Sequence, residues 1–163
     1  MEKVIVIGCP GSGKTVFSKK LNSLTNLPLY HLDAIWHKQD KTHITREEFD
    51  EKLLQIFNED KWIIDGNYQR TIEMRIINCD TIFLFDLPVN ICLQGVRERI
   101  GKERNDLPWI ETEVDEEFKK TIENFSIVNL PIIYELLKRY QFEKHIVVFK
   151  SREDVENYLK SIK

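Results

Sequence analysis

The chain has 163 residues, of which 42% are hydrophobic and 31% are charged. This length suits one domain over residues 1–163 with a sizeable core, and the five prolines and six glycines are too few for a disordered or fibrous protein. The formal net charge of −3 argues against nucleic acid as a partner, because domains that bind nucleic acid carry clustered positive charge.

The three cysteines, Cys9, Cys79 and Cys92, have no paired spacing. This indicates a reducing compartment rather than a disulfide framework or a cysteine zinc site. The apolar run over residues 4–8 is too short for a secretion signal, and no stretch approaches the roughly 18 apolar residues of a membrane span. We therefore expect a cytoplasmic protein without a membrane partner, present as a monomer or homodimer.

Five short apolar runs predict strands, and their continuous hydrophobicity is typical of strands buried on both faces of a sheet. The runs cover residues 4–7, 29–32, 62–64, 82–85 and 146–149. Stretches with helical spacing separate them, and two helix starts carry capping signals, Thr45 with Glu48 and Ser151 with Asp154. The alternation predicts an α/β domain built on a parallel sheet.

Residues 97–141 break this alternation because they contain no strand signal. Apolar spacing predicts two helices there, which Pro131 kinks or separates. An insertion before the last strand suits a lid over the site, which we place at about residues 97–130.

The strongest motif is GCPGSGKT at residues 8–15, which matches G-x-x-x-x-G-K-[ST] between a predicted strand and a predicted helix. Such a loop turns backbone N–H groups toward phosphate oxygens, and the helix presents its positive end to the same anion. We expect Lys14 to reach the β- and γ-phosphates of ATP and the Thr15 hydroxyl to ligate Mg²⁺. The other predicted nucleotide contacts in this loop are Gly8, Pro10, Gly11, Ser12 and Gly13. The alternative is a glycine-rich turn without a ligand.

Two aspartates follow predicted strands, where the crevice of a parallel sheet lies. Asp65, followed by Gly66, is a second candidate for Mg²⁺ or its waters, and the alternative is a simple Asp-Gly turn. Asp33 is a candidate to orient or deprotonate an acceptor hydroxyl, and the alternative is the N-cap of the next segment. We place the acceptor side at about residues 33–60.

Arginines form the last group of candidates, because forked guanidinium groups suit the charge that spreads over a transferring phosphoryl group. Arg70 lies close after Asp65, and Arg75 follows it. Arg97, Arg99 and Arg104 lie where the lid begins. The alternative for these three is a solvated helix face, since Glu98 and Glu103 interleave with them. The four histidines form no metal-ligand pattern.

These residues together resemble the adenylate-kinase-like P-loop proteins, and among them the bacterial topology modulation protein family. The resemblance covers nearly the whole chain. It rests on the motif at residues 8–15, Tyr30-His31-Leu32-Asp33 with Trp36, residues 62–68 (WIIDGNY) followed by Arg70, Phe85-Asp86-Leu87-Pro88, and residues 147–153 (VVFKSRE).

The resemblance implies a three-layer α/β/α P-loop NTPase fold, with a five-stranded parallel sheet in the order 2-3-1-4-5 and a helical lid that bears arginines. It implies ATP and Mg²⁺ as cofactors, and it places Ser151 and Arg152 beside the adenine. Two positions depart from the family pattern. Relatives usually carry an arginine where this chain has Gly95, and an Arg-Pro pair early in the lid where this chain has Arg104 four residues before Pro108.

The sequence therefore predicts an ATP- and Mg²⁺-dependent kinase that transfers a phosphoryl group to a small molecule, in the first place a nucleoside or a nucleotide. Arg70 favours a phosphorylated acceptor and Asp33 favours a hydroxyl acceptor. The alternative is a nucleotide-binding regulator of the topology-modulation type that acts through a partner and has no small-molecule kinase activity.

Overall fold

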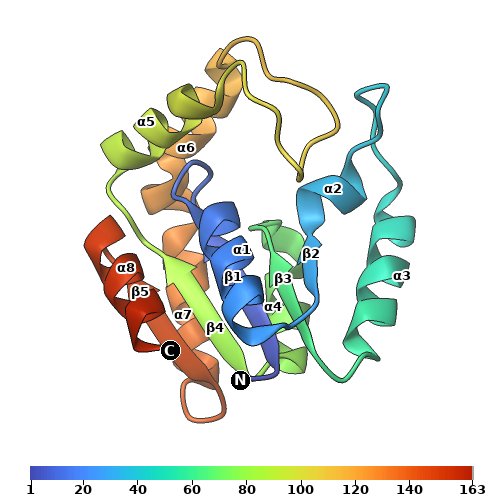
Figure 1. Cartoon of the computed structure of the whole chain (residues 1–163), viewed down its shortest axis with the longest axis vertical. Coiled ribbons are helices and arrows are strands. Elements are labelled where there is room, and N and C mark those ends of the chain that lie inside the picture. Colours follow the sequence, from blue (N-terminus) through green and yellow to red (C-terminus); the bar gives the residue numbers. More distant parts are fainter. Residues whose placement is uncertain (163) are drawn as a thin grey trace.

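The computed structural model describes residues 1–162, and at its centre lies one five-stranded, all-parallel sheet (Figure 1). The strands are β1 (Lys3–Gly8), β2 (Leu29–His31), β3 (Trp62–Asp65), β4 (Thr81–Phe85) and β5 (His145–Phe149). Their spatial order is β2-β3-β1-β4-β5. Both the five predicted strands and the order 2-3-1-4-5 are confirmed.

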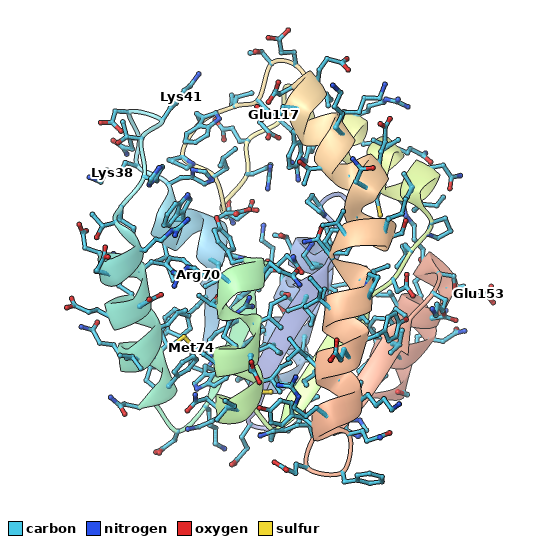
Figure 2. All side chains as sticks on the ribbon, turned by 180° about the vertical axis from the view of Figure 1, so that it is seen from behind. Lys38, Lys41, Arg70, Met74, Glu117 and Glu153 are labelled. Atoms are coloured by element: carbon cyan, nitrogen blue, oxygen red, sulfur yellow. The ribbon has the colours of Figure 1, made fainter. Side chains whose placement is uncertain are left out.

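The sheet carries helices on both faces, which makes three layers. The helices are α1 (Lys14–Thr25), α2 (Leu32–Trp36), α3 (Arg46–Phe57), α4 (Ile72–Asn78), α5 (Val89–Arg99), α6 (Glu116–Val128), α7 (Leu130–Tyr140) and α8 (Arg152–Ser161), with a short 3₁₀ turn, η1 (Gln69–Thr71), before α4. Figure 1 shows α1 and α8 in front of the sheet, and Figure 2 shows α4 and α7 on the opposite face.

Burial falls from the centre of the sheet to its edges. In the inner strands β3 and β4 every residue is buried, whereas β2 and most of β5 are only half-buried. The expectation that all five runs are buried on both faces is therefore wrong for the two edge strands, because each of these has a neighbour on one side only. Aromatic rings fill the layer between β4 and α1, where the centroids of Phe17 and Phe83 lie 4.9 Å apart.

The predicted helix starts are present. The Thr45 hydroxyl accepts a hydrogen bond from the Glu48 backbone N–H at 3.1 Å, and Ser151 forms a complete capping box with Asp154. Helix α6 ends at Val128 with Asn129 as its C-cap, and Pro131 lies in the first turn of α7. It therefore separates two helices rather than kinking one. Within residues 1–162, no helix has the length and apolar character needed to cross a membrane.

Helix α5 lies unusually close to the loop that joins β1 to α1. A Cβ added to Gly95 would lie 2.0 Å from the Gly11 carbonyl oxygen, and a Cβ added to Gly11 would lie 2.1 Å from the Cys92 carbonyl oxygen. Two backbones meet here, so neither can yield as a flexible side chain would. In this structure the contact leaves no room for a side chain at position 95.

We expect Gly95→Ala to lower the free energy of unfolding by about 2 kcal/mol or more, because the new Cβ overlaps the Gly11 carbonyl. Alanine otherwise gains about 1 kcal/mol over glycine inside a helix, so a net loss isolates the steric effect. Urea unfolding measures it, with Gln94→Ala on the exposed side of the same helix as the control. A Gly95→Ala variant as stable as the natural chain would contradict this close packing.

Candidate active site

The loop at residues 8–13 leaves β1 at Gly8 and enters α1 at Lys14. Gly13 occupies the N-cap position with a φ of 99°, a left-handed conformation that favours glycine. No side chain caps α1, and its first turn contains no acidic residue. The N-terminal N–H groups of α1 therefore remain available to an anion, as expected of a phosphate-binding loop.

A cavity of about 650 Å³ opens at the carboxyl ends of the strands, beside this loop. That volume falls within the usual range of small-molecule sites. The predicted site residues that line it are Pro10, Gly11, Ser12, Gly13, Lys14, Thr15, Asp33, Asp65, Arg99, Arg104 and Arg152. The structure thus brings most of the predicted nucleotide, metal, acceptor and lid residues to one cavity.

Lys14 is held within the loop by a backbone hydrogen bond. Its Nζ donates to the Cys9 carbonyl oxygen at 2.8 Å, and the side chain is buried. Burial lowers the pKa of Lys14 below its ordinary value, and the nearby Asp65 carboxylate opposes that shift. The ammonium group therefore lies beside the phosphate loop with one backbone acceptor.

Thr15 and Asp65 meet directly, although 50 residues separate them in the chain. The Thr15 hydroxyl donates to Asp65 Oδ2 at 2.9 Å, and His31 Nδ1 lies 2.8 Å from the same oxygen. Asp65 is buried. His31 was not among the predicted site residues, because its place beside Asp65 depends on the register of β2 against β3, which pairs these two residues.

This oxygen pair fits a magnesium ion. Mg²⁺ prefers oxygen ligands, and it usually takes one or two from the protein and the remainder from phosphates and water. Thr15 and Asp65 supply two such oxygens at the entrance to the phosphate loop. Residues 1–162 contain no cluster of three or more His, Cys, Asp or Glu side chains that could hold a metal by themselves, so such an ion would depend on the nucleotide for its other ligands.

Asp33 lies across the cavity from the phosphate loop and is oriented by Tyr68. The Tyr68 hydroxyl donates to Asp33 Oδ1 at 2.7 Å, while Arg104 Nη2 lies 4.0 Å from Asp33 Oδ2. Tyr68 has a φ of 33°, which is strained for a residue with a side chain and costs about 1–3 kcal/mol. Burial and the Asp33 carboxylate raise the pKa of Tyr68, so the phenol remains a donor.

Arg75 holds this strained segment in place. The side chain is fully buried, and its guanidinium donates to the backbone carbonyls of Gly66 at 2.7 Å, Tyr68 at 3.1 Å and Asn67. Burial lowers the pKa of Arg75 to about 9, so the group is still charged at neutral pH. Arg75 therefore stabilises the conformation of the loop after β3 and does not face the cavity.

Of the three arginines that the sequence places in the expected lid, two face the cavity and one does not. Arg99 and Arg104 line it, whereas Arg97 is exposed and lies outside it. Glu111 joins the two, since its Oε2 lies 3.0 Å from both Arg99 Nε and Arg104 Nη1. Burial and the charge of Arg104 lower the pKa of Arg99, which indicates two cations held close together in a partly dry environment.

Three other predicted residues do not line the cavity. Arg70 is exposed and bonded to Asp50 of α3, and Figure 2 shows it next to the start of α4. Ser151 caps α8, while its neighbour Arg152 lines the cavity. Gly8 ends β1, and its N–H donates to Asn67 Oδ1 at 3.2 Å.

Comparisons with known proteins agree on the fold. A shikimate kinase from Acinetobacter baumannii, solved in complex with shikimate, superimposes with a TM-score of 0.66 at 13% identity, covering 99% of this chain and 90% of that one. A deoxyadenosine kinase from M. mycoides, with dCMP and a flexible dCDP bound as products, superimposes with a TM-score of 0.57 at 13% identity, covering 98% and 95%. No protein-family model and no curated protein matches the chain. The chain therefore has the three-layer α/β/α fold of the P-loop kinases.

Proposed function

We propose that this protein is a kinase that transfers the γ-phosphoryl group of ATP, with Mg²⁺, to a small-molecule acceptor of the nucleoside or nucleotide class. One observation carries the proposal. The Thr15–Asp65 oxygen pair and the phosphate loop line the same cavity as Asp33, so groups suited to a nucleotide, a metal and an acceptor converge there.

Each of these residues has a role that follows from its position. Lys14 and the N–H groups at the start of α1 bind the phosphates of ATP. Thr15 and Asp65 hold Mg²⁺, which when bound neutralises charge on the β- and γ-phosphates. Asp33 lies where it can orient an acceptor hydroxyl and take its proton, as carboxylates do in kinases.

Arg99 and Arg104 belong to the segment at about residues 97–130 that we propose as the lid, and residues 33–60 form the proposed acceptor side. Guanidinium groups brought over the phosphates stabilise negative charge during transfer, and closure excludes water that would otherwise hydrolyse ATP. Arg152 lies on the nucleotide side of the same cavity. A cytoplasmic location and membership of the topology modulation protein family remain parts of this proposal.

The rival function is a nucleotide-binding regulator that acts through nucleic acid or another partner. It needs a basic surface, and Arg97, Arg99, Lys102 and Arg104 would supply it. Arg99 and Arg104 instead face the cavity and pair with Glu111. This pairing favours the kinase.

Lys14→Ala is expected to lower ATP-dependent phosphoryl transfer about 100-fold, because a donor to the transferring phosphates is lost. Labelled transfer from γ-labelled ATP to a panel of nucleosides, nucleotides, sugars and hydroxy acids measures it. Lys52→Ala, which removes an exposed lysine of α3, is the control. ATP binding without transfer to any acceptor, together with salt-sensitive DNA binding, would favour the regulator instead.

Asp65→Asn is expected to lower Mg²⁺-dependent turnover about 100-fold while ATP affinity measured without Mg²⁺ changes less than about tenfold, because the amide keeps the shape but loses the charge. Turnover as a function of Mg²⁺ concentration and a fluorescent-nucleotide titration in EDTA measure the two effects. Asp60→Asn, at an exposed turn before β3, controls for the loss of a carboxylate. Unchanged turnover in Asp65→Asn would remove Asp65 from the metal site.

A further inference from the structure

The arginines near the acceptor side already have partners inside the protein. Arg70 donates through both terminal nitrogens to Asp50, at 3.0 and 2.8 Å. Arg75 is buried among backbone carbonyls. Arg104 donates through Nε to Asp106 Oδ1 at 3.1 Å and through Nη2 to Asp106 Oδ2 at 2.5 Å. Forked guanidinium groups of this kind normally recognise an acceptor phosphate. Here all three already donate hydrogen bonds to groups of the protein.

Carboxylates predominate on the acceptor side of the cavity. Asp33 and Asp106 line it together with Arg99 and Arg104, and a third carboxylate, Glu111, lies 3.0 Å from both arginines. Arg104 is shared between Asp106 and Glu111, at 3.0 Å from the latter, so little of its positive charge remains for a ligand. Like charges in a partly buried site repel strongly. A dianionic acceptor would therefore meet net negative charge.

Asp33 by contrast has the features of a built site for a hydroxyl group. Tyr68 holds one carboxylate oxygen at 2.7 Å, and Arg75 holds the strained backbone that aims Tyr68. Strain of this kind persists only where the surroundings enforce it, and it concentrates at functional sites. The second oxygen of Asp33 lies 4.0 Å from the nearest Arg104 nitrogen, so it can accept a hydrogen bond from a ligand.

We infer that the acceptor is an uncharged hydroxyl compound, such as a nucleoside, held at the Asp33–Tyr68 pair, and that phosphate monoesters such as nucleotides are poor acceptors. This inference rests on the proposed kinase function and narrows its substrate class. The reaction transfers the γ-phosphoryl group of ATP to the hydroxyl oxygen, the O–P bond to ADP breaks, and the hydroxyl proton passes to Asp33. The products are a phosphate monoester and ADP.

Matched pairs of acceptors test the inference. The natural protein is incubated with γ-labelled ATP, Mg²⁺ and one of the ribonucleosides or 2′-deoxyribonucleosides, glucose or glycerol, or with the corresponding monophosphate. We expect at least one uncharged compound to be phosphorylated with a kcat/KM about tenfold or more above that of its monophosphate. Preferred phosphorylation of a monophosphate would overturn the inference and leave the kinase proposal standing. Labelled transfer to none of the compounds, despite ATP binding that requires Lys14, would overturn both.

Tyr68→Phe tests the acceptor site itself, because it removes the phenol hydrogen bond and keeps the ring. We expect the acceptor KM to rise, or kcat to fall, about tenfold, while the KM for ATP stays within about twofold. Tyr30→Phe is the matched control, since its phenol also bonds a carboxylate, Glu59 at 2.7 Å, on the exposed surface. Equal acceptor kinetics in Tyr68→Phe and the natural protein would overturn the assignment of this site. Should Tyr68→Phe not fold, Asp33→Asn replaces it with the same expected separation of acceptor and ATP kinetics.

Discussion

The site depends on one buried charge, the guanidinium of Arg75. Removing a guanidinium from water costs several kcal/mol unless other groups replace its hydration. Here the replacement comes from backbone carbonyls of Gly66, Asn67 and Tyr68 and from Thr71. The loop after β3 must therefore adopt a single path, because any other path would leave the charge without partners.

The same loop contacts both the start of the phosphate loop and Asp33. Asn67 accepts from the N–H of Gly8 and so ties the loop to the start of the phosphate-binding segment. Tyr68 orients Asp33 on the acceptor side. Gln69 accepts from Asn129 at 3.3 Å, which connects the same loop to the joint between α6 and α7. Three consecutive side chains, at residues 67–69, therefore connect the start of the phosphate loop, Asp33 and the junction of α6 and α7.

The strands and the phosphate loop could be predicted from the sequence because their signals are local, whereas the strand order rested on the family resemblance. Continuous apolar runs predicted the strands. The motif GCPGSGKT predicted the turn into α1 without information from other parts of the chain. The Thr15–Asp65 contact was also predictable, since the phosphate loop follows β1 and Asp65 ends β3, and these two parallel strands are neighbours in the sheet. The role of His31 was not, because it depends on the lateral register of β2 against β3.

The arginines were the least predictable group, because the direction of a long side chain depends on helix phase and on the partners that happen to be near. Arg99 faces the cavity and Arg97, two residues earlier, faces solvent. Arg70 and Arg75 looked alike in the sequence, yet one pairs with Asp50 on the surface and the other is wholly buried. For Arg70 and Arg75, residue spacing alone does not distinguish the two positions. They become distinct only when the path of the loop between β3 and α4 is known.

The close approach of α5 to the phosphate loop limits what position 95 can contribute to the cavity. The approach of α5 to Gly11 leaves no room for a side chain at this position, so an arginine there is excluded by sterics and not merely absent. Gly95 nevertheless lines the cavity, and the residues of α8 that share the wall with it are Arg152, Val155, Glu156 and Leu159. One cation, two apolar side chains and one carboxylate suit a flat heteroaromatic ring better than a phosphate. We therefore propose that α8, and not position 95, contributes contacts to the nucleotide base.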